Sequence, residues 1–367
     1  MVGYLALAYV VVFVAGSVLL SFSRKAVKKN SAAAICVTLF LIALGFITTY
    51  FEPFRRADLY RQYARIINFQ GVHFSEFLKV LFKDAMWGET LIYWLFSHFE
   101  SVKWYPFVFT VLVVGIAVWL TEKPYHEVIP VELFTIAMMV FFAGNSLTSI
   151  FGGVRNRFVN GVIVLCLYKV TEEHKRKIPY LLIMLFACFI HVSGIATLLF
   201  SALALVLRGR KKAAFILLPV FYSTAMQIMS GIGNSTVQYF VLKMKYYFED
   251  SYTISPKILL GYFLMLIFVL MVLWAIPKTE LSDSEYKYYN IVECLALFGG
   301  GCIFAPHIML RQTGLCCCAI LPLLGRVRLD KRKTITYVLL VSGIIGIGIC
   351  YIYGVLALPE SYVFTLL

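Results

Sequence analysis

Charged side chains are scarce in this sequence of 367 residues, where Asp, Glu, Lys and Arg together make up 14% and hydrophobic residues 61%. So little charge excludes an ordinary soluble domain, in which about a quarter of the residues are charged. Lys and Arg outnumber the acids, 33 against 19, yet they fall in short clusters between apolar runs and form no single basic face. This distribution argues against a nucleic-acid partner and predicts an integral membrane protein with short basic loops.

The nine cysteines lack the spacing of a metal site or a disulfide framework. The sequence contains no Cys-x-x-Cys pair and no set of cysteines and histidines at the spacing of a four-ligand metal site. Every cysteine stands in or beside an apolar run. We therefore predict neither a metal site nor a cofactor, and we expect Cys316, Cys317 and Cys318 to be packing residues, because free cysteine behaves as a small apolar residue.

Apolar runs and basic clusters together predict the topology, because a span needs roughly 17 to 25 apolar residues and cytoplasmic loops carry the excess of Lys and Arg. The run 2–22 has no basic residue before it and a basic cluster after it. We expect it to be a first span with its N-terminus outside, not a cleaved signal. The same rules predict an all-α, polytopic integral membrane protein of about twelve segments, with both termini outside. The expected spans are 2–22, 32–50, 104–120, 129–147, one starting near 155, two within 178–207, and 213–229, 258–276, 290–305, 315–324 and 336–356.

Two stretches do not read as simple spans. The run 178–207 is long, and a turn at His191–Gly194 would divide it into a hairpin that keeps the basic cluster at 208–212 inside; a single long span is the alternative. The stretch 51–103 contains only amphipathic segments. We expect it to be an external or interfacial helical region within a single transmembrane domain spanning 1–367.

This topology gathers a second set of ionisable residues on the external side, against the positive-inside bias. Bidentate recognition of phosphate or pyrophosphate by guanidinium groups would explain it. Gly152 and Gly153 interrupt an apolar run, and a helix starting near Val154 would direct unpaired N–H groups towards an anion. The alternative is that the arginines extend to lipid headgroups. The set comprises Arg55, Arg56, Asp58, Arg61, Arg65, Glu89, Arg155, Arg157, His191, His307 and Arg311.

Helical spacing places Asp58, Arg61 and Arg65 on one face, with Tyr60 and Tyr63 on a neighbouring one. A carboxylate between guanidinium groups, with tyrosines nearby, suits a sugar or headgroup site. An interfacial amphipathic helix whose arginines meet anionic lipids is the competing interpretation.

Four further residues have hypothetical roles. Glu89 is a base or a sugar-hydroxyl ligand, although an acid at a helix N-terminus is also explained by the macrodipole. His191 breaks an apolar run on the same side as Arg155, and a neutral imidazole there could deprotonate or orient an acceptor hydroxyl. His307 and Arg311, four residues apart in an expected external loop, contact either substrate or lipid.

Several stretches resemble the EpsG-like branch of Wzy-type polysaccharide polymerases. They are the Arg-x-Asp-x-Tyr stretch Arg56–Tyr60 with Tyr63 behind it, Glu89, the Gly-x-Arg stretch Gly153–Arg155, and the Phe-x-His-x-Ser stretch Phe189–Ser193. These stretches occur in the same order as in the family, and together they extend over most of the chain. The chain departs from the family pattern at Ala57, Thr90 and Asn156, where the family often has Gly, Pro and Gln.

The resemblance implies a GT-C-like, metal-independent glycosyltransferase of the bacterial plasma (inner) membrane, with its active site facing the periplasm or exterior. Its substrates would be polyprenyl-pyrophosphate-linked oligosaccharides of O-antigen, capsule or exopolysaccharide synthesis. Membrane lipids, a flippase and a chain-length regulator are the other expected partners. We predict His191, Glu89 and Asp58 as catalytic candidates. The predicted substrate-binding residues are Arg155, Arg157, Arg311, Arg56, Arg61, Tyr60, Tyr63 and His307.

Other classes fit less well. A lipid-oligosaccharide flippase needs charge along a path across the bilayer, whereas Glu293 is the main ionisable residue expected within a span. A membrane O-acyltransferase also uses histidine, but no histidine occurs in the early spans, and it remains the alternative enzyme. A ligase that moves finished glycan to another acceptor shares the donor chemistry, and no residue separates it from a polymerase.

Overall fold

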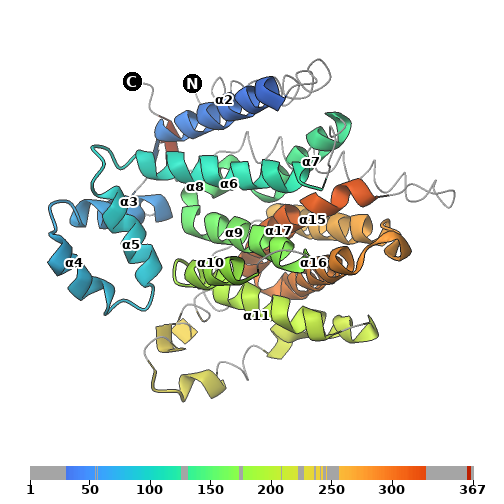
Figure 1. Ribbon diagram of the computed structural model, residues 1–367. Helices are drawn as coiled ribbons and strands as arrows, with labels where there is room; N and C mark the ends of the chain where they lie inside the picture. Colours follow the sequence, from blue (N-terminus) through green and yellow to red (C-terminus); the bar gives the residue numbers. More distant parts are fainter. Residues whose placement is uncertain are drawn as a thin grey trace.

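The computed structural model describes residues 30–53, 55, 57–124, 131–172, 177–207, 209–221, 227–234, 237–239, 241–242, 245, 256–327 and 362–364. Helices dominate these residues (Figure 1), which confirms the predicted all-α class. One short antiparallel ladder was not predicted: β1 (Phe51–Pro53) pairs with β2 (Tyr362–Phe364), with Glu52 opposite Val363. The predicted first and last spans, 2–22 and 336–356, lie outside the described residues.

The elements follow one another in this order: α2 (Asn30–Thr49), β1, α3 (Asp58–Asn68), α4 (Phe74–Leu81), α5 (Trp87–Phe96), α6 (Trp104–Glu122), α7 (Val131–Gly144), α8 (Leu147–Gly152), α9 (Val154–Thr171), α10 (Ile178–Cys188), α11 (Ser193–Val206), η1 (Gly209–Ala213), α12 (Ala214–Leu217), η2 (Leu218–Phe221), α15 (Pro256–Trp274), η3 (Lys278–Glu280), α16 (Asp283–Gly301), η4 (Cys302–Phe304), α17 (Pro306–Ala319), η5 (Leu321–Arg326) and β2.

Helix α9 lies at the centre of the bundle. It packs against α6, α10, α11, α16 and α17, so it is covered on several sides (Figure 1). Val159, Ile163 and Cys166 along it are fully buried. A helix enclosed in this way is fixed by its neighbours, and its N-terminal end is therefore held rigidly in place.

One helix in the described part of the chain, α6, is long and apolar enough to cross a membrane. Shorter apolar helices occupy 37–49, 178–188, 193–206 and 259–274. The prediction of two helices within 178–207 is confirmed, because α10 ends at Cys188 and α11 begins at Ser193. The count of about twelve spans and the GT-C-like arrangement stay predictions.

Two predicted segments differ in the structure. Within the predicted span 213–229, residues 213–221 are divided among the end of η1, α12 and η2, and residues 227–229 are helical. Pro219 lacks the N–H that a continuing α-helix needs. The expected loop around His307 and Arg311 is instead the start of α17, which runs as one helix to Ala319. Pro306 in its first turn suits a helix start, because its missing N–H would have no partner there.

Helices α3, α4 and α5 form a group of short helices at one end of α6 and α9 (Figure 1). They occupy the predicted external region 51–103, whose boundaries stay a prediction. Phe77 of α4 stacks on Trp94 of α5 with ring centroids 4.5 Å apart, and Phe96 packs edge-on against Tyr105 of α6. This aromatic packing joins α4 to α5 and holds α5 against the start of α6.

Candidate functional site

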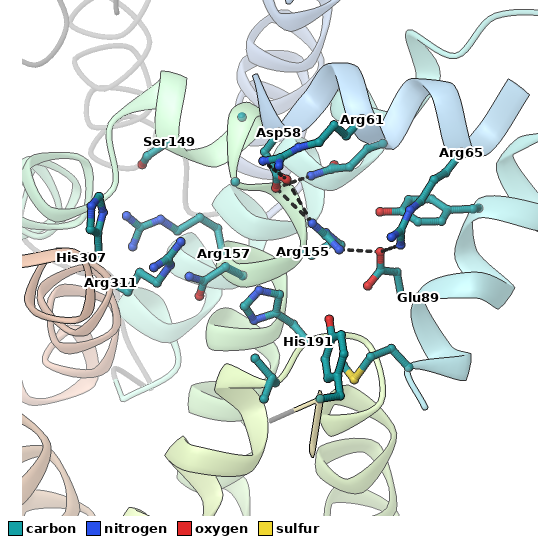
Figure 2. A pocket seen from close by; sticks show the side chains of 18 of the residues that line it. Asp58, Arg61, Arg65, Glu89, Ser149, Arg155, Arg157, His191, His307 and Arg311 are labelled. Atoms are coloured by element: carbon teal, nitrogen blue, oxygen red, sulfur yellow. Dashed lines mark hydrogen bonds and ion pairs between the residues drawn. The ribbon is translucent and has the colours of Figure 1, made fainter. Parts of the chain in front are cut away.

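A cavity of about 870 Å³ opens beside the N-terminal end of α9. Its walls come from α3, α5, the junction of α8 and α9, the turn between α10 and α11, and the start of α17. Figure 2 shows charged side chains from all of these segments directed into one space. Most of the predicted site residues line it, namely Asp58, Arg61, Glu89, Arg155, Arg157, His191, His307 and Arg311.

Backbone geometry at the α8–α9 junction aims the two arginines of α9. The Gly153 N–H donates to the Ser149 carbonyl at 3.0 Å, and α9 begins at the next residue, as predicted. A Cβ atom on Gly153 would lie 2.9 Å from that carbonyl oxygen, so a side chain does not fit there. The tight junction thus places Arg155 and Arg157 in the first turn of α9 at the cavity wall.

Arg155 is held between two carboxylates from separate helices. Its Nη2 atom donates to both oxygens of Asp58 on α3, at 3.2 and 3.1 Å. Its Nη1 atom donates to Glu89 Oε1 on α5, which also accepts from Arg65 Nη1 at 2.7 Å. The Arg155 side chain is 18% exposed and that of Glu89 3%. These partly desolvated, charge-assisted bonds fix α3, α5 and α9 relative to one another.

Asp58 stays ionised within this cluster. Burial by itself raises the pKa of its carboxyl group, but the adjacent Arg155 guanidinium, with Arg61 and Gln62, outweighs burial and lowers the pKa below its usual value. Arg61 Nη2 lies 3.2 Å from Asp58 Oδ1, and Gln62 Nε2 donates to Oδ2 at 2.7 Å. An ionised carboxylate with so many donors is a weak base.

Glu89 packs against the turn between α10 and α11, which carries His191. Its backbone N–H donates to the Phe189 carbonyl at 3.2 Å. Gly88 permits this approach, because a Cβ atom there would meet the Phe189 backbone at 3.0 Å. Burial, the Tyr105 hydroxyl and the Glu89 carboxylate together raise the pKa of Tyr93, so the Tyr93 hydroxyl remains a proton donor next to Glu89.

The imidazole of His191 is oriented by the first residue of α11. The backbone N–H of Ser193 donates to His191 Nδ1 at 3.2 Å, and the Ser193 hydroxyl lies 2.8 Å from the same atom. Because Nδ1 accepts from a backbone N–H, the neutral ring carries its proton on Nε2. Ser193 also donates to the Asn156 side chain at 3.4 Å, which links the turn to α9.

Arg157 has a different environment from Arg155. The residue is 4% exposed, and its Nη1 atom has no hydrogen-bond partner within the described ranges. Gly314 of α17 gives it space, since a Cβ atom there would overlap the Arg157 Nη1 atom. Figure 2 shows Arg311 beside Arg157 and His307 beyond them, away from Arg65 and Glu89. The cavity therefore has a cationic side and a side where charges are balanced.

Two of the predicted residues fall elsewhere. Tyr60 is exposed at the surface and Tyr63 is buried in the core, and neither is among the residues that line the cavity. Arg56 lies outside the described residues. The predicted face of α3 is confirmed, because Asp58, Arg61 and Arg65 all reach the cavity.

Several residues at this site had no role predicted from the sequence, including Gln62, Tyr93, Asn156 and Ser193. Gln62 lies four residues after Asp58, a helical spacing that could have indicated their contact. Ser193 belonged to a recognised stretch, but its contact with His191 depends on how the chain turns. The contacts of Tyr93 and Asn156 depend on the packing of separate helices.

No group of three or more His, Cys, Asp or Glu side chains in the described part of the chain could hold a metal ion. Among the cysteines whose side chains the structure describes, seven are buried and have free thiols: Cys166, Cys188, Cys294, Cys302, Cys316, Cys317 and Cys318. The burial of Cys316, Cys317 and Cys318 agrees with their predicted packing role.

Comparison with known proteins gives one match. A family model described as the EpsG family matches residues 60–356. No curated protein and no solved structure matches the chain.

Proposed function

The chain belongs to the EpsG family, and on that basis we propose that it is a membrane polysaccharide polymerase. It would transfer a glycan from a polyprenyl-pyrophosphate carrier to a hydroxyl group of a lipid-linked repeat unit, on the external face of the bacterial plasma membrane. The observation that carries the proposal is the division of the cavity into a cationic side, with Arg157, and a charge-balanced side, with Glu89.

This division matches the needs of glycosyl transfer. The acceptor hydroxyl oxygen forms a bond to the anomeric carbon of the donor, while the bond from that carbon to the pyrophosphate oxygen breaks. The leaving pyrophosphate keeps the electron pair and needs cations, and the hydroxyl proton needs a base. Arg157 lines the cavity, and no carboxylate among the described residues pairs with it, so its buried charge favours binding of a phosphate oxygen in a site that excludes water.

We assign the pyrophosphate to Arg157 and Arg311, with His307 beside them. The sequence named Arg155 first for this role, but Asp58 and Glu89 already compensate its charge. In this proposal Arg155 orients Glu89 and Asp58, and an anion would have to compete with two carboxylates to reach it. The helix N-terminus of α9 contributes its dipole to the same region.

Glu89 is the proposed base. Both guanidinium groups that bind its carboxylate donate to Oε1, so Oε2 carries no guanidinium bond among the described residues and can accept from a hydroxyl group. Asp58 is the weaker candidate because its pKa is lowered. The tautomer of His191 favours a hydrogen-bond donor to a substrate oxygen through Nε2 over a base.

A deletion strain tests the function. Loss of polymer, with accumulation of single lipid-linked repeat units, is the expected result. Full-length polymer that lacks an acyl group would instead support the O-acyltransferase. Normal lipid-linked polymer that is not transferred to its final acceptor would support the ligase, and lipid-linked units retained on the cytoplasmic face would support the flippase.

The base can be tested with the purified full-length protein, lipid-linked repeat units and no added metal. Glu89→Gln should abolish turnover while donor binding persists, whereas His191→Ala should reduce turnover only partly. If Glu89→Gln keeps near-wild-type turnover and His191→Ala loses it, the base is His191.

A further inference from the structure

A second cavity of about 300 Å³ adjoins the first, and Glu89 lines both. It is formed by the end of α3, the turn between α4 and α5, and the first turns of α5. Five residues line both cavities: Arg65, Met86, Glu89, Tyr93 and Tyr239. We call the smaller cavity the α4 pocket and propose that it binds the sugar of the acceptor glycan that carries the attacking hydroxyl group. This inference rests on the proposed polymerase function.

The charge of the α4 pocket excludes the pyrophosphate from it. Arg65 is its one cationic side chain among the described lining residues, and Arg65 is paired with Glu89 at 2.7 Å. Asp84 adds a second carboxylate. Two acids against one arginine disfavour an anionic ligand and suit the hydroxyl groups of a sugar, which donate hydrogen bonds to carboxylates.

Neutral polar groups and an apolar wall complete the pocket. Asn68 supplies an amide that both donates and accepts, and Thr90 supplies a hydroxyl group. Asp84 accepts hydrogen bonds from the Met86 N–H at 2.9 Å and from Thr90 Oγ1. These two bonds stabilise the turn between α4 and α5. Phe69, packed edge-on against Phe77 of α4, provides a flat apolar surface. A volume of about 300 Å³ is at the small end of ligand sites, which suits a sugar and excludes a polyprenyl chain.

Because Glu89 lines both cavities, it could contact an acceptor in one and a donor in the other. A hydroxyl group of a sugar in the α4 pocket could reach the Glu89 carboxylate from one side. The donor carbon would approach from the larger cavity, with its pyrophosphate towards Arg157. The proton then passes to Glu89 as the new C–O bond forms, and the electron pair of the broken bond leaves with the pyrophosphate.

Val80 offers a way to fill the α4 pocket without touching the catalytic candidates. It lies on α4 at the pocket wall and is 46% exposed. Val80→Trp adds a ring that can occupy the pocket. Lys79→Trp, at the preceding exposed position outside the pocket lining, is the matched control. Asn68→Ala is a second variant, at an exposed side chain, that removes a polar partner and adds no bulk.

The experiment uses full-length protein in nanodiscs, its lipid-linked repeat unit as donor, and as acceptor the free repeat-unit oligosaccharide released from the polymer of the same strain. Initial transfer rates give a KM for each substrate. We expect Val80→Trp to raise the acceptor KM at least tenfold and Asn68→Ala to raise it severalfold. The donor KM should change less than twofold, and Lys79→Trp should match the wild type.

An unchanged acceptor KM in Val80→Trp, in protein that elutes and melts like the wild type, would overturn the assignment. If Val80→Trp does not fold, Asn68→Ala decides, and an unchanged acceptor KM there would overturn it equally. Calorimetric titration of the free oligosaccharide separates the two claims. Binding that Val80→Trp abolishes, in a wild type that transfers no glycan, supports the pocket and refutes the polymerase. Transfer that neither variant alters refutes the pocket alone.

Discussion

A single methyl group at Gly314 should disable the proposed pyrophosphate site. A Cβ atom at this position would overlap Arg157 Nη1 and would lie 2.8 Å from its Cζ atom and 2.7 Å from the Asn145 side-chain oxygen. Arg157 is 4% exposed, and Asn145 is held by α17 through its 2.9 Å bond to the Gly314 carbonyl. Gly314→Ala must therefore displace the guanidinium from its present position.

The effects of Gly314→Ala on folding stability and on donor binding can be estimated separately. Overpacking a core costs about 1–3 kcal/mol, and Ala in place of Gly within a helix returns about 0.5–1 kcal/mol. The net loss of at most about 2.5 kcal/mol is smaller than the stability of most folded domains. A lost hydrogen bond between a guanidinium and a phosphate is worth about 1.5–3 kcal/mol, which corresponds to a rise of about 10- to 150-fold in the donor KM.

Gly300→Ala is the matched control, because a Cβ atom at this glycine of α16 has no neighbour within 4 Å. Donor KM is measured in nanodiscs with the released oligosaccharide at saturating concentration, and unfolding is followed by a thermal melt. Gly300→Ala should keep the wild-type KM and melt slightly higher. If Gly314→Ala folds and has the same donor KM as Gly300→Ala, Arg157 does not hold the pyrophosphate.

Three other predictions concern the ion-pair cluster and the topology. Arg155→Lys keeps the positive charge but cannot bridge Asp58 and Glu89 with a planar guanidinium group. The polymer seen on a gel should therefore be as short as in Arg155→Ala. Polymer of wild-type length in the lysine variant would show that only the charge of Arg155 matters. The pKa of Asp58 is lowered in the fold, so its contribution to stability is complete above its usual pKa of 3.8 and is lost as the pH falls below that value. The melting temperature of Asp58→Asn should therefore fall less with acid than that of the wild type. An equal fall in both proteins would contradict this. Cysteines introduced near Arg55 and Arg311 should react with an impermeant reagent from outside the cell, and reaction from the cytoplasm alone would invert the predicted topology.

Local sequence determined most of the helices, because their signals act over a few residues. Asp58, Arg61 and Arg65 share a face of α3 because a helix repeats every 3.6 residues, and α9 begins after Gly153 because that glycine allows the tight junction. Composition alone indicated a membrane protein, because the apolar content of a sequence can be counted without knowing how the chain folds. The match to the EpsG family over residues 60–356 agrees with the resemblance that the short motifs around Asp58, Arg155 and His191 indicated.

The sequence failed where the local signal was ambiguous. His307 and Arg311 looked like loop residues because they are polar, yet they lie in α17, where their polar groups face the cavity. The segment 213–229 looked like a span by hydropathy, and Pro219 interrupts it. Hydropathy counts apolar residues and does not register which backbone groups can pair.

Tertiary structure alone decided which of the charges around the cavity are paired. Arg155 and Arg157 are two residues apart in one helical turn and carry the same charge, so sequence cannot distinguish them. The packing of α3 and α5 brings Asp58 and Glu89 to Arg155, whereas α17 brings Gly314 and Arg311 to Arg157. Electrostatic interactions depend on distances and burial between helices far apart in the chain, and these are set only when the bundle is assembled.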